Sequence, residues 1–257
     1  MRLDVQEFGP SAGRTVVALH GVTGSPHVFR RLAHRLPSFH FVAPAFRGHG
    51  ASPKEPPWDL SAHLRDVRET LDARGISRAP FIGFSFGGRV AVELLVADRS
   101  RIERLVLLDP ALRVDPQRAL AITDGLLADT SYGSTEEAIQ ARIDLGLTPY
   151  APREHWDIWA EDLVEGPDGR LRLPFSRPAA MTIYSELTTP PPPFASLRLP
   201  TLLIVGAESP LVTPQQIERY KYELADFLEV KSVRAKHQLI GDAADEVAAA
   251  VGAFLAR

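Results

Sequence analysis

The sequence predicts an α/β protein with a mostly parallel, doubly wound sheet and an inserted helical cap. Short, solidly apolar strand-like runs alternate with amphipathic helical segments over residues 1–110. The alternation stops over residues 111–197 and resumes over residues 198–257. We therefore expect a core in two parts, 1–110 and 198–257, with a helical cap formed by residues 111–197 between them.

Strand and helix patterns alternate through the first part of the core. Ser25 and Pro26 have the pattern of a helix N-cap followed by proline at the first helical position. Apolar residues at helical spacing predict a second helix over 60–74, with Gly75 as its C-terminal stop. The strands are expected at residues 3–8, 15–19, 39–42, 79–82 and 105–108.

Capping and apolar patterns also predict the elements of the second part of the core and of the cap. Thr213, followed by proline and then by Gln216, fits a capping box that opens a helix. This helix stands between two predicted strands, 201–206 and 227–233, and a last helix is expected over 243–255. In the cap, helical pieces are expected at 117–128, 135–145 and 152–164, with a turn at 166–169.

Composition and charge limit the classes of partner. The 257 residues carry a net charge of −3, which gives no reason to expect nucleic acid or an anionic membrane surface. We expect a small-molecule substrate, and the oligomeric state stays open. The absence of cysteine excludes disulfides and thiolate metal sites, and no histidine spacing suggests a metal. The first residues lack the apolar run of a signal peptide, so the expected compartment is the cytoplasm.

The segment Gly83-Phe84-Ser85-Phe86-Gly87 has the pattern of a nucleophile turn. It follows a short apolar strand and precedes a helix that we expect from Arg89 to about Ala97. A sharp strand-to-helix turn strains the backbone of its central residue, so small residues are needed two positions on either side. Gly83 and Gly87 fill these positions, and the turn exposes the Ser85 hydroxyl beside a helix N-terminus.

A serine nucleophile needs a base, and His237 is the best-placed histidine. It lies in the loop between the last predicted strand and the last helix, at the carboxyl edge of the sheet. His20 also follows a strand, but it directly precedes a glycine turn that it is expected to shape. His49, between two glycines, is expected to organise its loop.

These segments together resemble the α/β-hydrolase family with a cap domain. The resemblance rests on Gly83 to Gly88, a late His237, and two segments near the N-terminus: His20-Gly21-Val22-Thr23-Gly24 and Arg47-Gly48-His49-Gly50 followed by Ser52. It implies a sheet of the eight-stranded type. It also implies an oxyanion hole formed by the backbone N–H groups of Val22 and Phe86, and no cofactor.

The acid of the expected triad departs from the commonest family pattern. Many relatives carry an aspartate after the seventh strand, and the position that looks equivalent here is Ser209, which cannot stabilise an imidazolium as a carboxylate does. Asp109, at the end of the strand after the nucleophile helix, is the first candidate. Glu208, one residue from the usual place and longer, is the alternative.

The cap is expected to lie over Ser85 and to shape the substrate pocket. Trp156, Trp159, Tyr132 and Tyr150 are the candidate wall residues from the cap. Phe84 and Phe86, which flank the nucleophile, are expected to line the pocket from the core. These side chains favour an uncharged, apolar acyl group.

The expected function is hydrolysis of a carboxylic ester or lactone of a small to medium molecule through an acyl-enzyme. One alternative is hydrolysis of a carbon–carbon bond in a vinylogous diketone, as some capped relatives perform. It would require cap groups that bind a carboxylate tail, for which Arg142 and Arg153 are candidates. A second alternative is a ligand-binding or sensor protein on the same scaffold.

Overall fold

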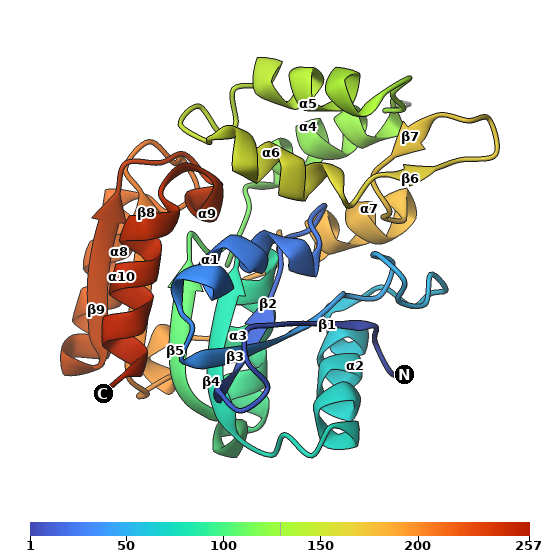
Figure 1. The fold of residues 1–257 in the computed structure, drawn as a ribbon. Helices are drawn as coiled ribbons and strands as arrows, with labels where there is room; N and C mark the ends of the chain where they lie inside the picture. The colour runs from blue at the N-terminus through green and yellow to red at the C-terminus, as the bar shows by residue number, and fades with distance from the viewer. Residues whose placement is uncertain (129) are drawn as a thin grey trace.

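The computed structural model describes residues 1–128 and 130–257, with Ser196 described by its backbone only. Its centre is a twisted sheet in the order β1-β3-β2-β4-β5-β8-β9 (Figure 1). β1 pairs with β3 antiparallel and every other pair is parallel. The described sheet has seven strands, one fewer than the eight-stranded type. The strands are β1 (Val5–Phe8), β2 (Arg14–Leu19), β3 (Phe39–Pro44), β4 (Ala79–Phe84), β5 (Ile102–Leu108), β8 (Thr201–Gly206) and β9 (Leu228–Val233).

Helices cover both faces of the sheet because the central strands are apolar on both sides. In β5, Leu105 and Leu107 pack into one apolar cluster, and Val106 and Leu108 pack into the other. One cluster is covered by α2 (Leu60–Ala73), α3 (Phe86–Ala97) and α8 (Pro214–Leu224). The opposite cluster is covered by α1 (Arg30–Arg35) and α10 (Ala244–Leu255).

The chain between β5 and β8 forms a layer of its own above the sheet (Figure 1). Besides the helices expected from the sequence it contains a short hairpin, β6 paired with β7, and a fourth helix, α7. The hairpin closes through the expected glycine turn, where the Gly166 N–H donates to the Arg170 carbonyl at 2.8 Å. The elements are α4 (Pro116–Leu127), α5 (Thr135–Asp144), α6 (Arg153–Ala160), β6 (Val164–Glu165), β7 (Leu171–Arg172) and α7 (Arg177–Glu186).

Polar contacts join this layer to the core near α1 and near the short 3-10 helix η1 (Pro26–Phe29) that precedes α1. Arg30 pairs with Glu161 at 2.6 Å, and the His27 imidazole contacts the Asp162 carboxylate at 2.7 Å. The contacts place α6 over the loop that follows β2. Among the residues that the structure describes, no helix combines the length and apolarity that a membrane crossing requires.

Candidate active site

Ser85 occupies the strained turn that its flanking glycines make possible. Its backbone has φ 52° and ψ −117°, between the end of β4 and the start of α3. A Cβ on Gly87 would lie 2.0 Å from the Leu19 carbonyl oxygen, and one on Gly83 would lie 2.6 Å from the Gly87 carbonyl oxygen. Only glycine fits at these two positions, so the sequence pattern and the turn geometry agree.

His237 connects Ser85 to Asp109. Its Nε2 lies 3.0 Å from the Ser85 hydroxyl oxygen, and its Nδ1 lies 2.6 Å from a carboxylate oxygen of Asp109. The imidazole is held from the side by Phe84, whose ring lies 5.0 Å from it, centroid to centroid, at an interplanar angle of 28°. This arrangement can pass a proton from the hydroxyl to a base oriented by a carboxylate.

Of the two candidate acids, Asp109 contacts the imidazole and Glu208 does not. Asp109 is completely buried, with its backbone in the left-handed region at φ 40°, which aspartate tolerates. Ser209 donates its hydroxyl hydrogen bond to the same carboxylate oxygen at 2.6 Å. Ser209, at the position that looks equivalent to the family's usual acid, therefore helps to hold the carboxylate of the candidate acid Asp109. Glu208 instead accepts a hydrogen bond from the Tyr150 hydroxyl at 2.6 Å.

The Val22 and Phe86 amides are available to a ligand. Phe86 is the first residue of α3, and the loop of Val22 approaches Ser85 closely enough that a Cβ on Gly21 would lie 3.2 Å from the Ser85 Cβ. Within the described chain, neither amide donates a hydrogen bond to another residue. Two free N–H groups beside a nucleophile suit a developing oxyanion.

Two buried histidines shape the loops around these amides, as the sequence indicates. His20 accepts a hydrogen bond from the Phe46 N–H at 2.9 Å, and its other ring nitrogen donates to the Gly21 carbonyl at 2.7 Å. The His49 Nε2 donates to the Val22 carbonyl. Burial lowers the pKa of both imidazoles, so they stay neutral.

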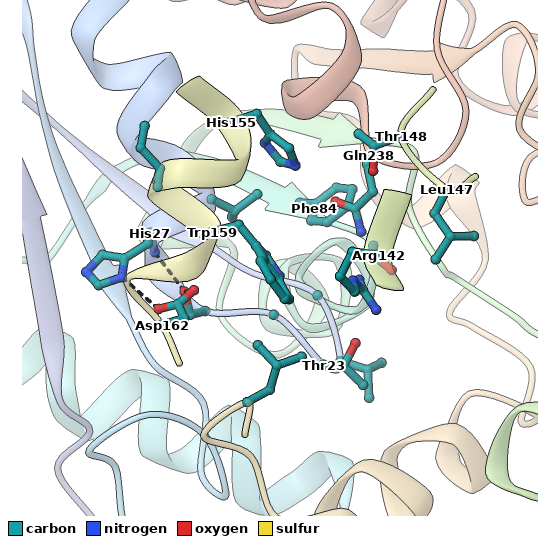
Figure 2. A pocket seen from close by; sticks show the side chains of 18 of the residues that line it. Thr23, His27, Phe84, Arg142, Leu147, Thr148, His155, Trp159, Asp162 and Gln238 are labelled. Atoms are coloured by element: carbon teal, nitrogen blue, oxygen red, sulfur yellow. Dashed lines mark hydrogen bonds and ion pairs between the residues drawn. The ribbon is translucent and has the colours of Figure 1, made fainter. Parts of the chain in front are cut away.

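A cavity of about 200 Å³ lies between the core and the cap and includes Ser85 and His237 in its wall. Phe84, Trp156 and Trp159, three of the residues expected in the pocket wall, line it. Figure 2 shows Phe84 and Trp159 there. The Trp156 and Trp159 rings pack edge to face, with their centroids 6.3 Å apart.

Three expected wall residues lie elsewhere. Tyr150 is outside the cavity lining, and its hydroxyl donates to Glu208 at 2.6 Å. Tyr132 is outside the cavity lining because its backbone pairs with Leu171 in two hydrogen bonds of 2.9 and 2.8 Å, which hold it beside β7. The Phe86 ring is buried in the core, packed against Phe46 and His63 with centroid distances of 5.1 and 5.2 Å. The turn therefore directs Phe84 toward the cavity and Phe86 away from it.

The cavity also contains charged residues whose position the sequence does not indicate. Asp162 accepts from the Ser25 hydroxyl and contacts the His27 imidazole (Figure 2). No sequence signal points to this group, because Asp162 lies more than 130 residues from both partners. Of the two candidate arginines, Arg142 lines the cavity, whereas Arg153 is exposed and pairs with an acidic residue on each of α5 and α6. In the described residues no cluster of three or more His, Cys, Asp or Glu side chains forms a metal site.

Comparison with known proteins identifies the family. A model of the alpha/beta hydrolase family matches residues 16–250. The chain belongs to the alpha/beta hydrolase family. Within this family it is similar to the lipase LipV of Mycobacterium tuberculosis, with 36% identity over 185 residues that span 72% of this chain and 71% of LipV. It is also similar to the esterase YbfF of Escherichia coli, with 37% identity over 37% of this chain and 38% of YbfF.

Comparison with solved structures supports the fold over the whole chain. The crystal structure of E-2-(acetamidomethylene)succinate hydrolase superposes with a TM-score of 0.86 at 23% identity, covering 99% of this chain and 95% of that one. The protein PA1622 of Pseudomonas aeruginosa superposes with a TM-score of 0.80 at 29% identity, covering 99% and 96%. The first of these likenesses shows the fold alone.

Proposed function

We propose that this protein is a serine hydrolase that cleaves short carboxylic esters or lactones. The observation that carries the proposal is the continuous chain of contacts from the Ser85 hydroxyl through His237 to the buried Asp109 carboxylate. The family match and the relatives named lipase and esterase support an ester-cleaving hydrolase. A ligand-binding protein would have no need to keep this proton path intact.

In the proposed mechanism His237 removes the proton of Ser85 as the hydroxyl oxygen attacks the ester carbonyl. Asp109 orients the imidazole and stabilises the imidazolium that forms. The negative charge of the tetrahedral intermediate falls on the former carbonyl oxygen, which the Val22 and Phe86 amides bind. His237 then protonates the leaving alcohol, and water hydrolyses the acyl-enzyme by the same path in reverse.

The size of the cavity favours small substrates. Since a water molecule occupies about 30 Å³ in the liquid, a cavity of about 200 Å³ has room for about seven waters. Ligand sites for drug-sized molecules start at about 300 Å³. The cavity therefore favours short acyl chains, and we expect activity to fall with acyl length.

The test is a panel of p-nitrophenyl esters of graded acyl length, measured with the wild-type protein and Ser85→Ala. We expect turnover of the short esters and a loss of about 10⁶-fold in kcat in the variant, the size of effect that removal of a nucleophilic serine has in a serine protease. An active-site serine probe should label the wild type and not the variant. Full turnover by Ser85→Ala would refute the proposal. Tight ligand binding without labelling would favour the sensor alternative.

A carbon–carbon bond hydrolase is the second candidate, and one observation favours it. That reaction requires a cationic group in the cap for the carboxylate tail of the substrate, and Arg142 lines the cavity. Turnover of a ring-fission dienoate at a higher kcat/KM than the best ester would make this the function. Ser85 and His237 would then catalyse the cleavage of the carbon–carbon bond.

A further inference from the structure

Arg142 brings a cation into the cavity that contains Ser85. It extends from α5 and lines the wall together with Trp159, and both side chains point into the same space (Figure 2). Its guanidinium carbon lies 5.5 Å from the centroid of the Trp159 ring. Among the described residues, no acidic side chain pairs with this guanidinium and no carbonyl accepts a hydrogen bond from it.

The other charged groups in the cavity wall are already paired. Arg31 donates to two backbone carbonyls at 2.9 and 2.8 Å and lies 3.3 Å from Glu154. Asp162 is paired with His27. Arg142 is therefore the charged lining residue in the described chain whose hydrogen-bonding groups are free for a ligand.

Partial burial of Arg142 makes an unpaired guanidinium costly in the empty enzyme. Loss of hydration lowers the pKa of the Arg142 guanidinium, although an arginine remains charged at neutral pH. A partly desolvated cation without a counter-ion is unfavourable, and a bound anion would offset that cost. The planar guanidinium has two parallel N–H groups, a geometry that matches a carboxylate.

The cavity-lining side chains nearest to Arg142 along the chain and from α6 carry no charge that would take the place of such an anion. Burial lowers the pKa of His155, which also lines the cavity, to about 4, so this imidazole is neutral at pH 7. Leu147 and Thr148, the next cavity-lining residues along the chain, carry no charge. The uncharged acyl group expected from the sequence would fit the aromatic wall and leave the Arg142 cation without a partner.

We propose that Arg142 binds a carboxylate of the substrate, so that the preferred substrates are short esters or lactones that carry a free carboxylate, such as half-esters of dicarboxylic acids. This inference rests on the proposed function, because it assigns the scissile carbonyl to Ser85 and the second, anionic group of the same small molecule to Arg142. The cavity of about 200 Å³ sets the length of that molecule.

The test compares two esters of nearly equal size and shape. Ethyl hydrogen succinate carries the carboxylate, and ethyl 4-oxopentanoate carries an uncharged methyl ketone in its place. We expect the wild type to prefer the first by at least about tenfold in kcat/KM. Because a hydrogen bond to a charged group contributes about 1.5–3 kcal/mol, Arg142→Gln should lower the ratio of the two kcat/KM values by about 10- to 150-fold.

Two further variants separate charge from shape and from general damage. Arg142→Lys keeps the charge without the planar fork, so its ratio should fall between those of the wild type and the glutamine variant. Arg153→Gln removes an arginine from the outer surface of the same cap, where it pairs with Glu136 and Asp157, and should leave the ratio unchanged. An equal change in both arginine-to-glutamine variants would refute a specific role of Arg142.

Binding without turnover gives an independent readout. By calorimetry, Ser85→Ala should bind ethyl hydrogen succinate, and the double variant with Arg142→Gln should bind it at least about tenfold more weakly. An unchanged affinity and an unchanged ester ratio would overturn this inference and leave the proposed function intact. Retained ester turnover by Ser85→Ala would instead overturn the proposed function, whatever the effect of Arg142.

Discussion

Replacement of Asp109 by asparagine tests the proton path while keeping the fold. Asparagine tolerates the left-handed backbone of this position, φ 40°, and has nearly the size and shape of aspartate. The Gly206 N–H donates to the Asp109 Oδ1 at 3.4 Å, so the amide oxygen of the introduced asparagine is expected on that side. Its NH₂ group then faces the His237 Nδ1, which in the wild type contacts Oδ2 at 2.6 Å.

The expected loss follows from the tautomer that this amide imposes. With a donor facing Nδ1, the neutral imidazole carries its proton on Nε2 and cannot accept the Ser85 proton across the 3.0 Å contact. The same exchange in a serine protease lowers kcat by about 10⁴-fold, which corresponds to about 5.4 kcal/mol. We expect a loss of this order for Asp109→Asn in hydrolysis of p-nitrophenyl acetate, with a free energy of unfolding in urea that is unchanged to within about 1 kcal/mol.

Glu208→Gln is the matched control, because Glu208 is exposed and bonds to the Tyr150 hydroxyl instead of to His237. Its kcat/KM should stay within about twofold of the wild type. The double variant Asp109→Asn with Ser209→Asp should recover part of the lost activity, since the Ser209 hydroxyl lies 2.6 Å from the carboxylate oxygen that contacts the imidazole. A large loss of kcat/KM in Glu208→Gln, together with an active Asp109→Asn, would refute the assignment of Asp109 as the acid.

Three further predictions concern stability. Asp66→Asn leaves the buried Arg47 guanidinium without its carboxylate, which it now contacts at 2.7 and 2.8 Å, and should lower the free energy of unfolding by about 3–5 kcal/mol in urea titrations. Gly87→Ala places a Cβ 2.0 Å from the Leu19 carbonyl oxygen and should abolish soluble expression; a folded, active variant would contradict the turn geometry. Burial lowers the pKa of His63 to about 3, from 6.5 in the unfolded chain, so the unfolded state binds a proton first and stability falls as the pH drops below 6.5 toward 3. Between about pH 7.5 and 5 this loss is about 2 kcal/mol, and His63→Leu should remove it from the pH profile of the urea midpoint.

The core elements were predictable from the sequence because two-sided burial leaves a strong local pattern. The strand expected at 201–206 is β8 as observed, and the helix expected at 60–74 ends one residue earlier, at Ala73. Thr213 forms both hydrogen bonds of the expected capping box. In each case the residues that determine the element lie within it or next to it.

The cap was less predictable because its elements are short and half-exposed. The helix expected over 152–164 covers only Arg153–Ala160, and α7 was missed, although Ser176 caps it and a proline occupies its first turn. That pattern of Ser176 and Pro178 was the available signal. The β6–β7 hairpin has only two residues in each strand, too few for a period of two to be recognised.

The site residues also differ in how far the sequence indicates them. Ser85 could be predicted because a sharp strand-to-helix turn imposes its own sequence pattern, and His237 because its loop follows the last strand at the carboxyl edge of the sheet. The choice between Asp109 and Glu208 depends on the direction of side chains that are nearly 100 residues apart, and the hydrogen bond from Ser209 to Asp109 spans a similar interval. The position of Tyr132 outside the cavity follows from its pairing with Leu171, which no local pattern encodes.

The division between core and cap also separates chemistry from selectivity. The groups proposed to move protons and bind the oxyanion come from strand ends and from the first turn of α3, which the packed sheet holds rigidly. Arg142, in contrast, comes from a cap helix in which only Ala138 and Ile139 are buried. A substitution at position 142 is therefore expected to alter the substrate preference without disturbing the sheet.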